Sequence, residues 1–394
     1  MPVLLDQCYL SGTAWFRMRS SRKSTAPYKE DILSCQDCER INTLPSGTGT
    51  LYLAPVLAHT RATLRQRLLE ERFPCSEPAS GILAVTVDRE HGLGDTLMRL
   101  DEALSHSEQN GCRATFVPEG EDFGVEHLQD THLLSTLIAR HNARDLAAIL
   151  ASDALDFHFQ PIVHAASPDR VFAWEALVRA SSPAGEFIPP NILFDQARAA
   201  EMMFHLDRAA RINAIRRATE RGIHDQLFIN FNPTAIYDPA FCLETTVREI
   251  RDIPPEMTAP AGFVFEVIES DQITDTEHLR RIIDRYRNAG FRVALDDLGA
   301  GYASLNLLSQ LRPDFVKIDR ELVRGIDGDE YQQKILDKII ELARDLEIRI
   351  VAEGIETAEE WRWLRDRVDY CQGFLFARPA ADPPAPVHPE TATG

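Results

Sequence analysis

Acidic and amide side chains recur in the second half of this sequence, each near the end of a short apolar run. The set consists of Glu175, Asn230, Glu266, Glu269, Asp296, Asp297, Glu353, Glu356 and Gln372, with Lys317 and Asp319 in an equivalent position. Seven carboxylates of this set, brought together, would repel one another and would need cations. Hard divalent ions that prefer oxygen ligands, Mg²⁺ or Mn²⁺, are the expected partners, with Asn230 as a neutral oxygen ligand.

The elements that would position these residues are strands alternating with helices. Short apolar runs predict strands at Phe157–Val163, Val171–Val178, Leu227–Asn230, Phe263–Ile268, Arg292–Leu295, Phe315–Ile318, Arg349–Ala352 and Gly373–Phe376. Helical patterns lie between most of them, at Asn191–Gly222, Asp275–Ala289, Tyr331–Leu346 and Ala358–Arg367. Eight strands in roughly 240 residues favour an α/β fold, a (β/α)8 TIM-like barrel, over an open doubly wound sheet. Strand ends converge at one mouth of such a barrel, so the acids would share a site.

Each acid also has a simpler role available when it is taken alone. A single acid near a strand end is usually a helix cap or a surface loop charge. Asp296-Asp297, which precedes two glycines, is compatible with a turn, and Lys317 with Asp319 is compatible with a surface ion pair. The recurrence of such residues on strand after strand favours a common site.

The motifs of this half resemble, in order, those of the EAL-domain cyclic-di-GMP phosphodiesterases. The resemblance covers about residues 155–380 and rests on the segments Gln160–Val163, Glu175–Arg179, Phe228–Asn232, Glu266–Ser270, Asp296–Ser304, Lys317–Arg320, Ala352–Thr357 and Gln372–Phe374. It implies a metal-dependent hydrolase that cuts one phosphodiester of cyclic-di-GMP and gives linear pGpG.

The resemblance also implies roles for individual residues. The residues that correspond to ligands of a first metal ion are Glu175, Asn230, Glu266 and Asp296. Asp297 corresponds to a residue that bridges toward a second ion. Lys317 corresponds to the lysine that orients the attacking water, and Glu353 to the general base. Glu356 would support metal or substrate, and Glu269 would anchor the loop that follows Asp297.

Substrate-binding positions follow from the same resemblance. They are Gln160, Leu177, Arg179, Asp319 and Gln372, of which Arg179 would contact a phosphate of the ligand. Two metal ions about 3.5–4 Å apart can lower the pKa of a bound water and steady the entering and leaving oxygens. The metals and Arg179 would offset the charge of the phosphodiester.

Several residues depart from the family pattern. They are Asn232, Ile268, Leu298, Ala300 and Ala303, and none of them removes a metal ligand or the base. The last three lie in the loop that couples dimer contacts to metal binding in this family. We predict an active enzyme and, by the same likeness, a homodimer formed through the barrel. The alternative is a catalytically weak or inactive cyclic-di-GMP receptor that signals through its N-terminal domain.

Residues 1–125 differ from the second half of the chain in sequence pattern. We predict that they form a smaller α/β domain. The segments Gly81–Val87, Leu97–Leu104 and Asn110–Arg113 faintly resemble the C-terminal part of a GGDEF domain. Where the cyclase signature is expected the chain has Ser46–Thr50, so the metal-binding acids of a cyclase are missing. We expect a degenerate, regulatory remnant, and an unrelated α/β sensor is an equal alternative.

Cysteine spacing raises a separate question in this region. Cys35-Gln36-Asp37-Cys38 has the spacing of half a zinc site, which Cys8, His59 and Cys75 would complete. A redox-sensing pair or two ordinary thiols would have the same spacing, and one Cys-x-x-Cys pair alone does not choose among these roles.

The composition bounds the whole chain. Its 394 residues include 42 basic and 61 acidic side chains, a formal net charge of −19. Proteins that bind nucleic-acid polymers usually carry a basic stripe, so such a partner is not expected. The sequence lacks a run of about 18 apolar residues, which predicts no membrane insertion. The seven scattered cysteines and the start at Met1–Asp6, which does not resemble a signal peptide, favour a cytoplasmic protein.

These observations predict four parts. They are an N-terminal domain at 1–125, a linker helix at 126–155, the barrel at 156–380 and a disordered tail at 381–394. The tail is expected to be disordered because it is rich in proline and alanine.

Overall fold

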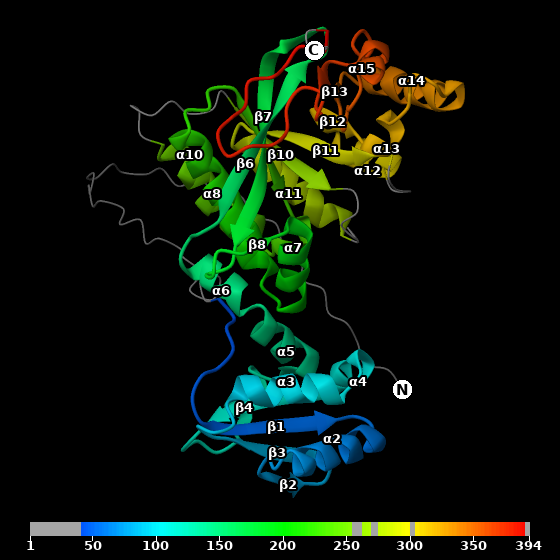
Figure 1. Ribbon diagram of the computed structural model, residues 1–394. Coiled ribbons are helices and arrows are strands. Elements are labelled where there is room, and N and C mark those ends of the chain that lie inside the picture. The colour runs from blue at the N-terminus through cyan, green and yellow to red at the C-terminus, as the bar shows by residue number, and fades with distance from the viewer. Residues whose placement is uncertain (1–40, 254–261, 269–274, 300–303, 391–394) are drawn as a thin grey trace, which may run out of the picture. The chain divides into compact units, whose positions relative to one another are not determined.

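A computed structural model describes residues 41–253, 262–268, 275–299 and 304–390 of the chain (Figure 1). The strands of these residues form one five-stranded and one nine-stranded sheet. None of the helices in this part of the chain has the length and apolar character needed to cross a membrane.

The N-terminal sheet is antiparallel and has the order β2-β3-β1-β4-β5. Its strands are β1 (Gly49–Pro55), β2 (Cys75–Ala79), β3 (Ile82–Val87), β4 (Cys112–Pro118) and β5 (His132–Leu133). Its helical elements are α2 (Ala58–Glu70), α3 (Leu93–Ala103), α4 (His106–Asn110) and the 3₁₀ turn η1 (Val125–Leu128). In β1, Leu51 and Leu53 point into the core while their neighbours are half exposed, the alternation of a sheet covered on one face. The expected smaller α/β region is confirmed.

Eight strands of the second sheet close into a barrel, as expected from the sequence. They are β6 (Asp156–His164), β7 (Ser167–Ser181), β9 (Gln226–Phe231), β10 (Gly262–Ile268), β11 (Arg292–Leu298), β12 (Phe315–Ile318), β13 (Arg349–Ala352) and β14 (Tyr370–Cys371). β6 pairs with both β7 and β14, which completes the ring, and β8 (Phe187–Ile188) extends β7 outside it. The chain therefore has a TIM-like barrel with a smaller α/β region before it.

Helices follow most strands and cover the barrel. They are α7 (Pro190–Ala199), α8 (Met203–Glu220), α9 (Pro239–Cys242), α10 (Glu244–Arg251), α11 (Thr276–Asn288), α12 (Ser304–Leu311), α13 (Arg320–Val323), α14 (Glu330–Asp345) and α15 (Ala358–Leu364), with the 3₁₀ turn η2 at Pro233–Ala235. One large apolar cluster fills the space between them and the outward faces of the strands. Side chains of Asp275, Asp319, Asp329 and Thr357 accept backbone hydrogen bonds and begin their helices.

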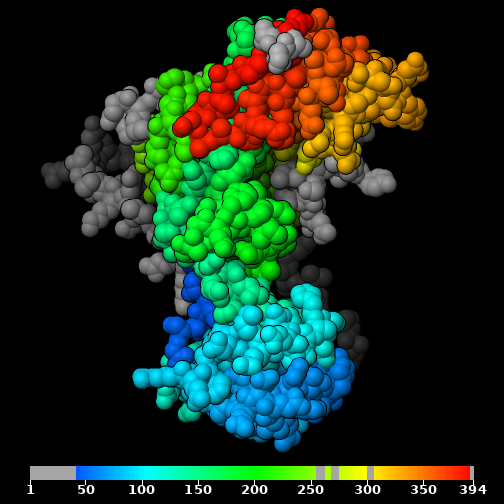
Figure 2. All heavy atoms as spheres, viewed as in Figure 1, coloured from blue at the N-terminus to red at the C-terminus, as the bar shows by residue number. Residues whose placement is uncertain are grey.

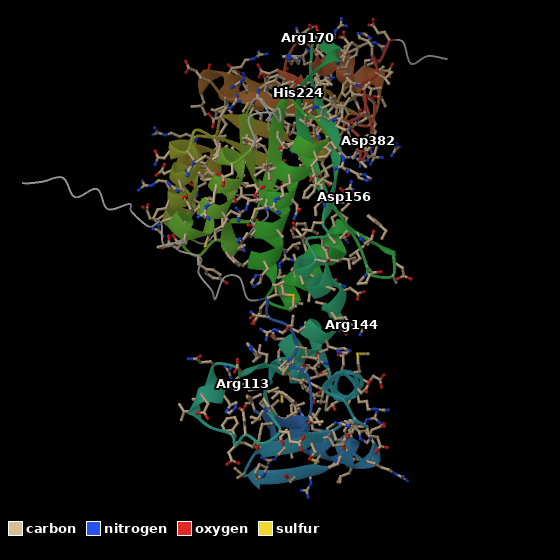
Figure 3. All side chains as sticks on the ribbon, turned by 90° about the vertical axis from the view of Figure 1, so that its left-hand side faces the viewer. Arg113, Arg144, Asp156, Arg170, His224 and Asp382 are labelled. Carbon is tan, nitrogen blue, oxygen red and sulfur yellow. The ribbon has the colours of Figure 1, made fainter. Side chains whose placement is uncertain are left out.

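The first two barrel strands differ from the expected alternation. β6 and β7 are joined directly as a long antiparallel hairpin, so β6 runs against the other strands of the barrel. Figure 3 labels Asp156 and Arg170, which lie toward opposite ends of this hairpin. No helix forms between the two strands because only Ala165 and Ala166 separate them.

The last expected strand, Gly373–Phe376, is wrong. The strand is Tyr370–Cys371. The apolar run after it is a loop whose backbone packs on, and hydrogen-bonds to, Ile355. Ile355 N donates to Gln372 O (3.1 Å), and Leu375 N donates to Ile355 O (3.1 Å). A Cβ on Gly373 would lie 2.0 Å from Ile355 O, so the two backbones approach as closely as glycine permits.

Two other expectations also differ from the structure. The segment 126–155 is not a single helix: it contains part of η1, strand β5 and the helices α5 (Leu134–Asn142) and α6 (Arg144–Ala151). The tail is not disordered over 381–390, because Val387 N donates to Phe376 O (2.9 Å) and the His388 ring lies edge-on to Trp361. Figure 2 shows this red segment lying along the barrel surface. Residues 391–394 are outside the described part of the chain.

Candidate metal and catalytic site

The barrel interior has an apolar floor and a polar layer above it. The floor consists of Ile162, Ala173, Phe228, Val264, Ala294, Phe315, Val351 and Tyr370, one residue from each strand. The polar layer lies two residues from the floor position of each strand, on the side of the barrel mouth. Because side chains of a strand alternate with a period of two, the residue at that position, within the strand or just after it, also points into the barrel, and for every strand it is polar. These polar residues are Gln160, Glu175, Asn230, Glu266, Asp296, Lys317, Glu353 and Gln372. The barrel geometry thus brings together eight residues that the sequence had singled out.

Lys317 lies at the centre of this layer. Its Nζ is 2.6 Å from Glu353 Oε1, 2.9 Å from Glu266 Oε1, 3.3 Å from Asp296 Oδ1 and 3.5 Å from Glu175 Oε1. Only 1% of the lysine side chain is exposed, so water does not screen these charges. The simpler role of Lys317, a surface ion pair, is therefore excluded.

Amide side chains fix one wall of the site. Gln372 Nε2 donates to Glu175 Oε2 (2.6 Å) and to Gln160 Oε1 (3.2 Å), and Asn230 Nδ2 donates to Glu175 Oε1 (3.2 Å). Gln160 in turn donates to the Ala377 carbonyl. Glu175 lies six residues before the end of β7, because that strand continues outward to pair with β8. It is therefore an interior side chain rather than a strand-end residue.

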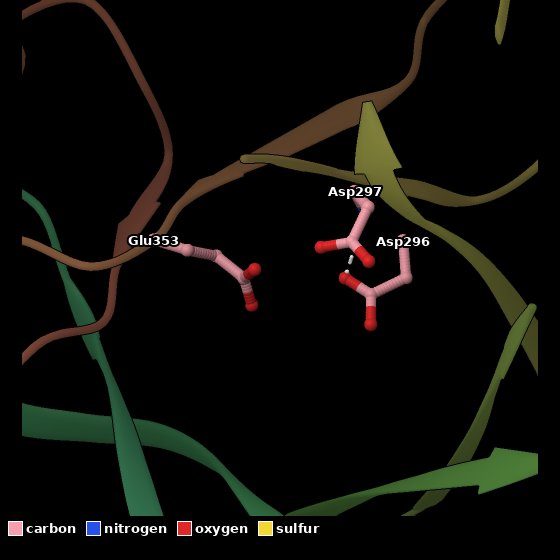
Figure 4. Close-up of side chains that lie close together, drawn as sticks. All are labelled: Asp296, Asp297 and Glu353. Atoms are coloured by element: carbon pink, nitrogen blue, oxygen red, sulfur yellow. Dashed lines mark hydrogen bonds between the residues drawn. The ribbon is translucent and has the colours of Figure 1, made fainter. Parts of the chain in front are cut away.

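A backbone irregularity presents two successive carboxylates on the other side. The β11–β12 register shifts between Leu295 and Leu298, and Asp297 adopts a left-handed φ of 57°. Asp296 Oδ1 accepts a hydrogen bond from Asp297 N (2.9 Å). Ligand oxygens of Asp296, Asp297 and Glu353 all lie within 4.8 Å of one another (Figure 4). Adjacent residues of a regular strand would point to opposite faces, so the bulge is what makes this grouping possible.

The titration behaviour reflects an excess of negative charge. Burial, followed by the neighbouring carboxylates, raises the pKa of Glu266 and Glu353 well above the ordinary range and raises that of Asp296. Burial and then Asp296 raise the pKa of Asp297 to about 6. Burial opposes the ionised form of Glu175, but Lys317 and the amide hydrogen bonds bring its pKa below the ordinary value. The surrounding carboxylates hold the pKa of Lys317 well above its usual value despite burial.

The donor set fits hard divalent cations. Neither oxygen of the fully buried Glu266 receives a hydrogen bond of good geometry from a described residue, although Oε1 is at ion-pair distance from Lys317. Buried carboxylate oxygens without donors are costly unless a cation or a proton binds them. Five carboxylates and one amide oxygen around this point are the ligands that Mg²⁺ and Mn²⁺ prefer.

The remaining predicted residues lie around this centre. Leu177 and Arg179 are half-buried and follow Glu175 at alternate positions of β7, so they share its face. Arg179 Nη1 donates to the Val178 carbonyl (2.8 Å). Asp319 caps the start of α13. Glu269 lies outside the described residues.

Glu356 does not lie within the close carboxylate group. Its Oε1 is 3.0 Å from Arg320 Nη2, and both side chains are about half exposed. The aliphatic stem of Arg320 crosses Gly354, where a Cβ would lie 2.6 Å from the Cβ of Arg320. The tight turn at Gly354, with φ of 64°, therefore separates the direction of Glu356 from that of Glu353.

Sequence reasoning missed two buried acids that support the site from behind. Glu360 accepts from the backbone amides of Gly325 (2.9 Å), Glu356 (2.9 Å) and Thr357 (3.0 Å), and so ties together two loops of the mouth. The capping-box spacing of Thr357 and Glu360 could have indicated this role. Asp207 accepts from Asn232 N (2.7 Å), and no local sequence signal identifies that contact.

Comparison with protein families gives a match to the EAL domain over residues 143–379. The chain belongs to the EAL domain family. The matched region begins just before α6 and contains the whole polar layer. The expected family is thereby confirmed.

Two curated relatives are similar to this chain in sequence. The chain is 27% identical over 371 residues to the cyclic di-GMP phosphodiesterase PdeR of Escherichia coli (strain K12). The aligned region covers 88% of this chain and 52% of PdeR. It is 30% identical over 245 residues to the blue light- and temperature-regulated antirepressor BluF of the same organism, covering 61% of this chain and 59% of BluF. The chain therefore spans less than two thirds of the length of either relative.

A solved structure matches the barrel. It is a standalone versatile EAL protein from Vibrio cholerae O395 in its c-di-GMP-bound form, with 33% identity and a TM-score of 0.52. The match covers 61% of this chain and 98% of that chain. The barrel of the present protein therefore has the same fold as that protein.

Proposed function

We propose that this protein hydrolyses one phosphodiester bond of cyclic-di-GMP and releases linear pGpG, in a reaction that requires divalent metal ions. The observation that carries the proposal is the buried polar layer, in which one lysine lies among acids that outnumber it. Membership of the EAL family and a relative named as a cyclic di-GMP phosphodiesterase support the choice of substrate.

Within this proposal two Mg²⁺ or Mn²⁺ ions are held by the carboxylates of the layer. Glu175, Asn230, Glu266 and Asp296 would hold the first ion, and Asp297 would reach toward the second. Five ionised carboxylates and one ammonium leave four negative charges, which two divalent cations would balance. When bound, such ions lower the pKa of water and offset phosphate charge. Glu356, which faces Arg320, would support the metals or the substrate from the rim.

Other side chains would act as the general base, orient the nucleophile and bind the substrate. Glu353, whose pKa is raised and which contacts Lys317 at 2.6 Å, would accept the proton of the nucleophile as general base. Lys317, whose ammonium position is set by four nearby carboxylates, would orient that nucleophile by hydrogen bonding. Arg179 would bind a phosphate oxygen, and the other substrate positions are Gln160, Leu177, Asp319 and Gln372.

The test is an assay of the purified full chain with cyclic-di-GMP in Mg²⁺ and in Mn²⁺. We expect pGpG in at least one metal, and we expect Glu353→Gln to slow its formation by about 10²–10⁴-fold. A folded wild-type protein that produces no pGpG with either ion would contradict the proposal.

A second candidate function is that of a cyclic-di-GMP receptor with little turnover. Two observations favour it: the altered loop at 298–303, and a relative named as an antirepressor. Calorimetry in Ca²⁺ measures ligand binding separately from hydrolysis. Tight binding without turnover in Mg²⁺ or Mn²⁺ would favour the receptor. The enzyme remains our choice because Glu353, Lys317 and the two aspartates are all present.

Partners and organisation form the last part of the proposal. We assign the N-terminal α/β domain a regulatory role over the barrel, with domain limits near those expected from the sequence. We also propose a homodimer formed through the barrel, no nucleic-acid polymer as partner, and a cytoplasmic location. Cys35 and Cys38, whose spacing suits a zinc site, a redox pair or two ordinary thiols, lie outside the described residues.

A further inference from the structure

A charged pair is buried in helix α8, behind the strand that carries Asn230. Asp207 and Arg211 lie one helical turn apart, and they are 4% and 0% exposed. Arg211 Nε and Nη2 both lie 2.9 Å from Asp207 Oδ2. A buried pair of this kind is weak evidence for stability, because apolar residues of similar volume often do as well. The other contacts of Asp207 and Arg211 therefore have to explain why the pair is buried here.

The free oxygen of Asp207 holds the backbone at the end of β9. Asp207 Oδ1 accepts a hydrogen bond from Asn232 N (2.7 Å). Asn232 also begins η2, since its side-chain oxygen accepts from Thr234 N (2.8 Å) and Thr234 Oγ1 (2.6 Å). The peptide two residues after Asn230 is thus fixed on both sides, and with it the exit of the strand that presents Asn230 to the site.

Arg211 connects this point to two further helices. Its Nη1 donates to Thr246 Oγ1 on α10. The Tyr286 ring on α11 is buried beside it and stacks on Phe265 at 4.0 Å and 13°. Phe265 precedes Glu266, which pairs in register with Asn230. The Arg211 guanidinium therefore connects α8 with α10 and α11. Of these helices, α8 packs behind β9 and α11 behind β10, the two strands that supply Asn230 and Glu266.

We propose that Asp207 and Arg211 form a positioning pair that sets the place of Asn230 in the metal site. Arg211 orients the Asp207 carboxylate, and the carboxylate fixes the Asn232 amide. The inference rests on the proposed function, since it assigns Asn230 to the metal site. It concerns residues that touch neither metal nor substrate, so their effect must pass through the backbone of β9.

The decisive variant is Asp207→Leu/Arg211→Met, which removes both charges and leaves no buried charge alone. Asp207→Ala/Arg211→Met is the second variant. It is used if the leucine of Asp207→Leu/Arg211→Met is too large for the protein to fold. Arg216→Met is the matched control, because Arg216 lies on the same helix and binds Glu249 of α10 at 2.8 Å but is 43% exposed. Arg211→Lys is the conservative variant, which keeps a cation beside Asp207.

The first measurement is hydrogen–deuterium exchange of the full chain, resolved to single amides over residues 228–234. We expect the Asn232 amide to exchange at least tenfold faster in the double variants and at the wild-type rate in Arg216→Met and Arg211→Lys. The second is the Mn²⁺ concentration that gives half-maximal hydrolysis, which we expect to rise at least tenfold in the double variants. We expect kcat at saturating Mn²⁺ to change less than threefold.

Unchanged exchange at Asn232 in a folded double variant would overturn the positioning role, and a lowered melting temperature alone would identify a purely structural pair. An absence of hydrolysis in the wild type would count against the proposed function instead. The exchange comparison would still decide the positioning role in that case, because it requires neither metal nor turnover.

Discussion

At the scale of single residues, the charge of Lys317 is what allows five carboxylates to occupy one barrel interior. The lysine is enclosed and contacts four of them at ion-pair distance. In a water-excluded interior the attraction of these pairs offsets part of the desolvation of each charge. Removing the lysine leaves the acids facing one another, so its effect should appear in stability as well as in activity.

We therefore predict that Lys317→Met lowers the free energy of unfolding by about 3–5 kcal/mol, the usual cost of removing one partner of a buried ion pair. Urea unfolding of the full chain measures it. Arg362→Met is the control, because Arg362 pairs with Glu359 but is 50% exposed. The control should change stability by less than about 1 kcal/mol. Equal effects of the two variants would show that Lys317 is not the central cation of the layer.

A second prediction concerns Glu353. Glu353→Gln keeps the size of the side chain and removes the proton acceptor, so kcat should fall by about 10²–10⁴. Binding of cyclic-di-GMP in Ca²⁺ should stay within a few-fold of wild type. Steady-state kinetics and calorimetry measure the two effects. A variant that retains most of its kcat would assign the base to another residue.

At the scale of elements, the sequence predicted the barrel strands well where buried residues alternate or run together, and it failed where an apolar run served another purpose. Gly373–Phe376 is apolar because it packs in a loop against Ile355, and hydrophobicity alone does not separate that from a strand. The antiparallel direction of β6 depends on pairing at both of its edges, which no local pattern contains. The polar layer was predictable in its members because the motifs are local. The enclosure of Lys317 was not, because it arises only when the ring closes.

The close approach of Gly373 and Ile355 gives a prediction at this scale. Gly373→Ala forces a Cβ against the Ile355 backbone and should displace Gln372, which binds Glu175. We expect a loss of about 1–3 kcal/mol in unfolding free energy and a lower kcat/KM. Gly328→Ala is the control, since its Cβ would meet nothing closer than 3.8 Å. Thermal unfolding and kinetics would contradict this prediction if both variants behaved like the wild type.

At the scale of the whole molecule, the net charge of −19 is shared between a solvated surface and an acidic interior that calls for cations. The surface also carries apolar residues at helical spacing on α14 and just after it, namely Tyr331, Ile335, Leu342 and Leu346, all of them exposed. Such a row is typical of a face that a partner covers. It supports the proposed homodimer through the barrel.

We accordingly predict that Ile335→Glu with Leu342→Glu shifts the protein from dimer to monomer at micromolar concentration. Burying a carboxylate in an apolar interface is unfavourable, and the face itself is exposed in the monomer, so the fold should persist. Sedimentation velocity measures the assembly state. Lys334→Glu, a polar position on the same helix, should leave the dimer intact. A wild-type protein that sediments as a monomer would contradict the dimer proposal.

Metal-dependent hydrolysis in the polar layer is the claim on which the other assignments depend. The measurement that tests it is the release of pGpG from cyclic-di-GMP by the purified full chain, compared between Mn²⁺ and a chelator. We predict turnover with Mn²⁺ or Mg²⁺, none with the chelator, and a kcat lower by at least about 10²-fold in Glu353→Gln with either ion. Turnover that persists in the chelator, or a folded wild type that never releases pGpG, would contradict the central claim.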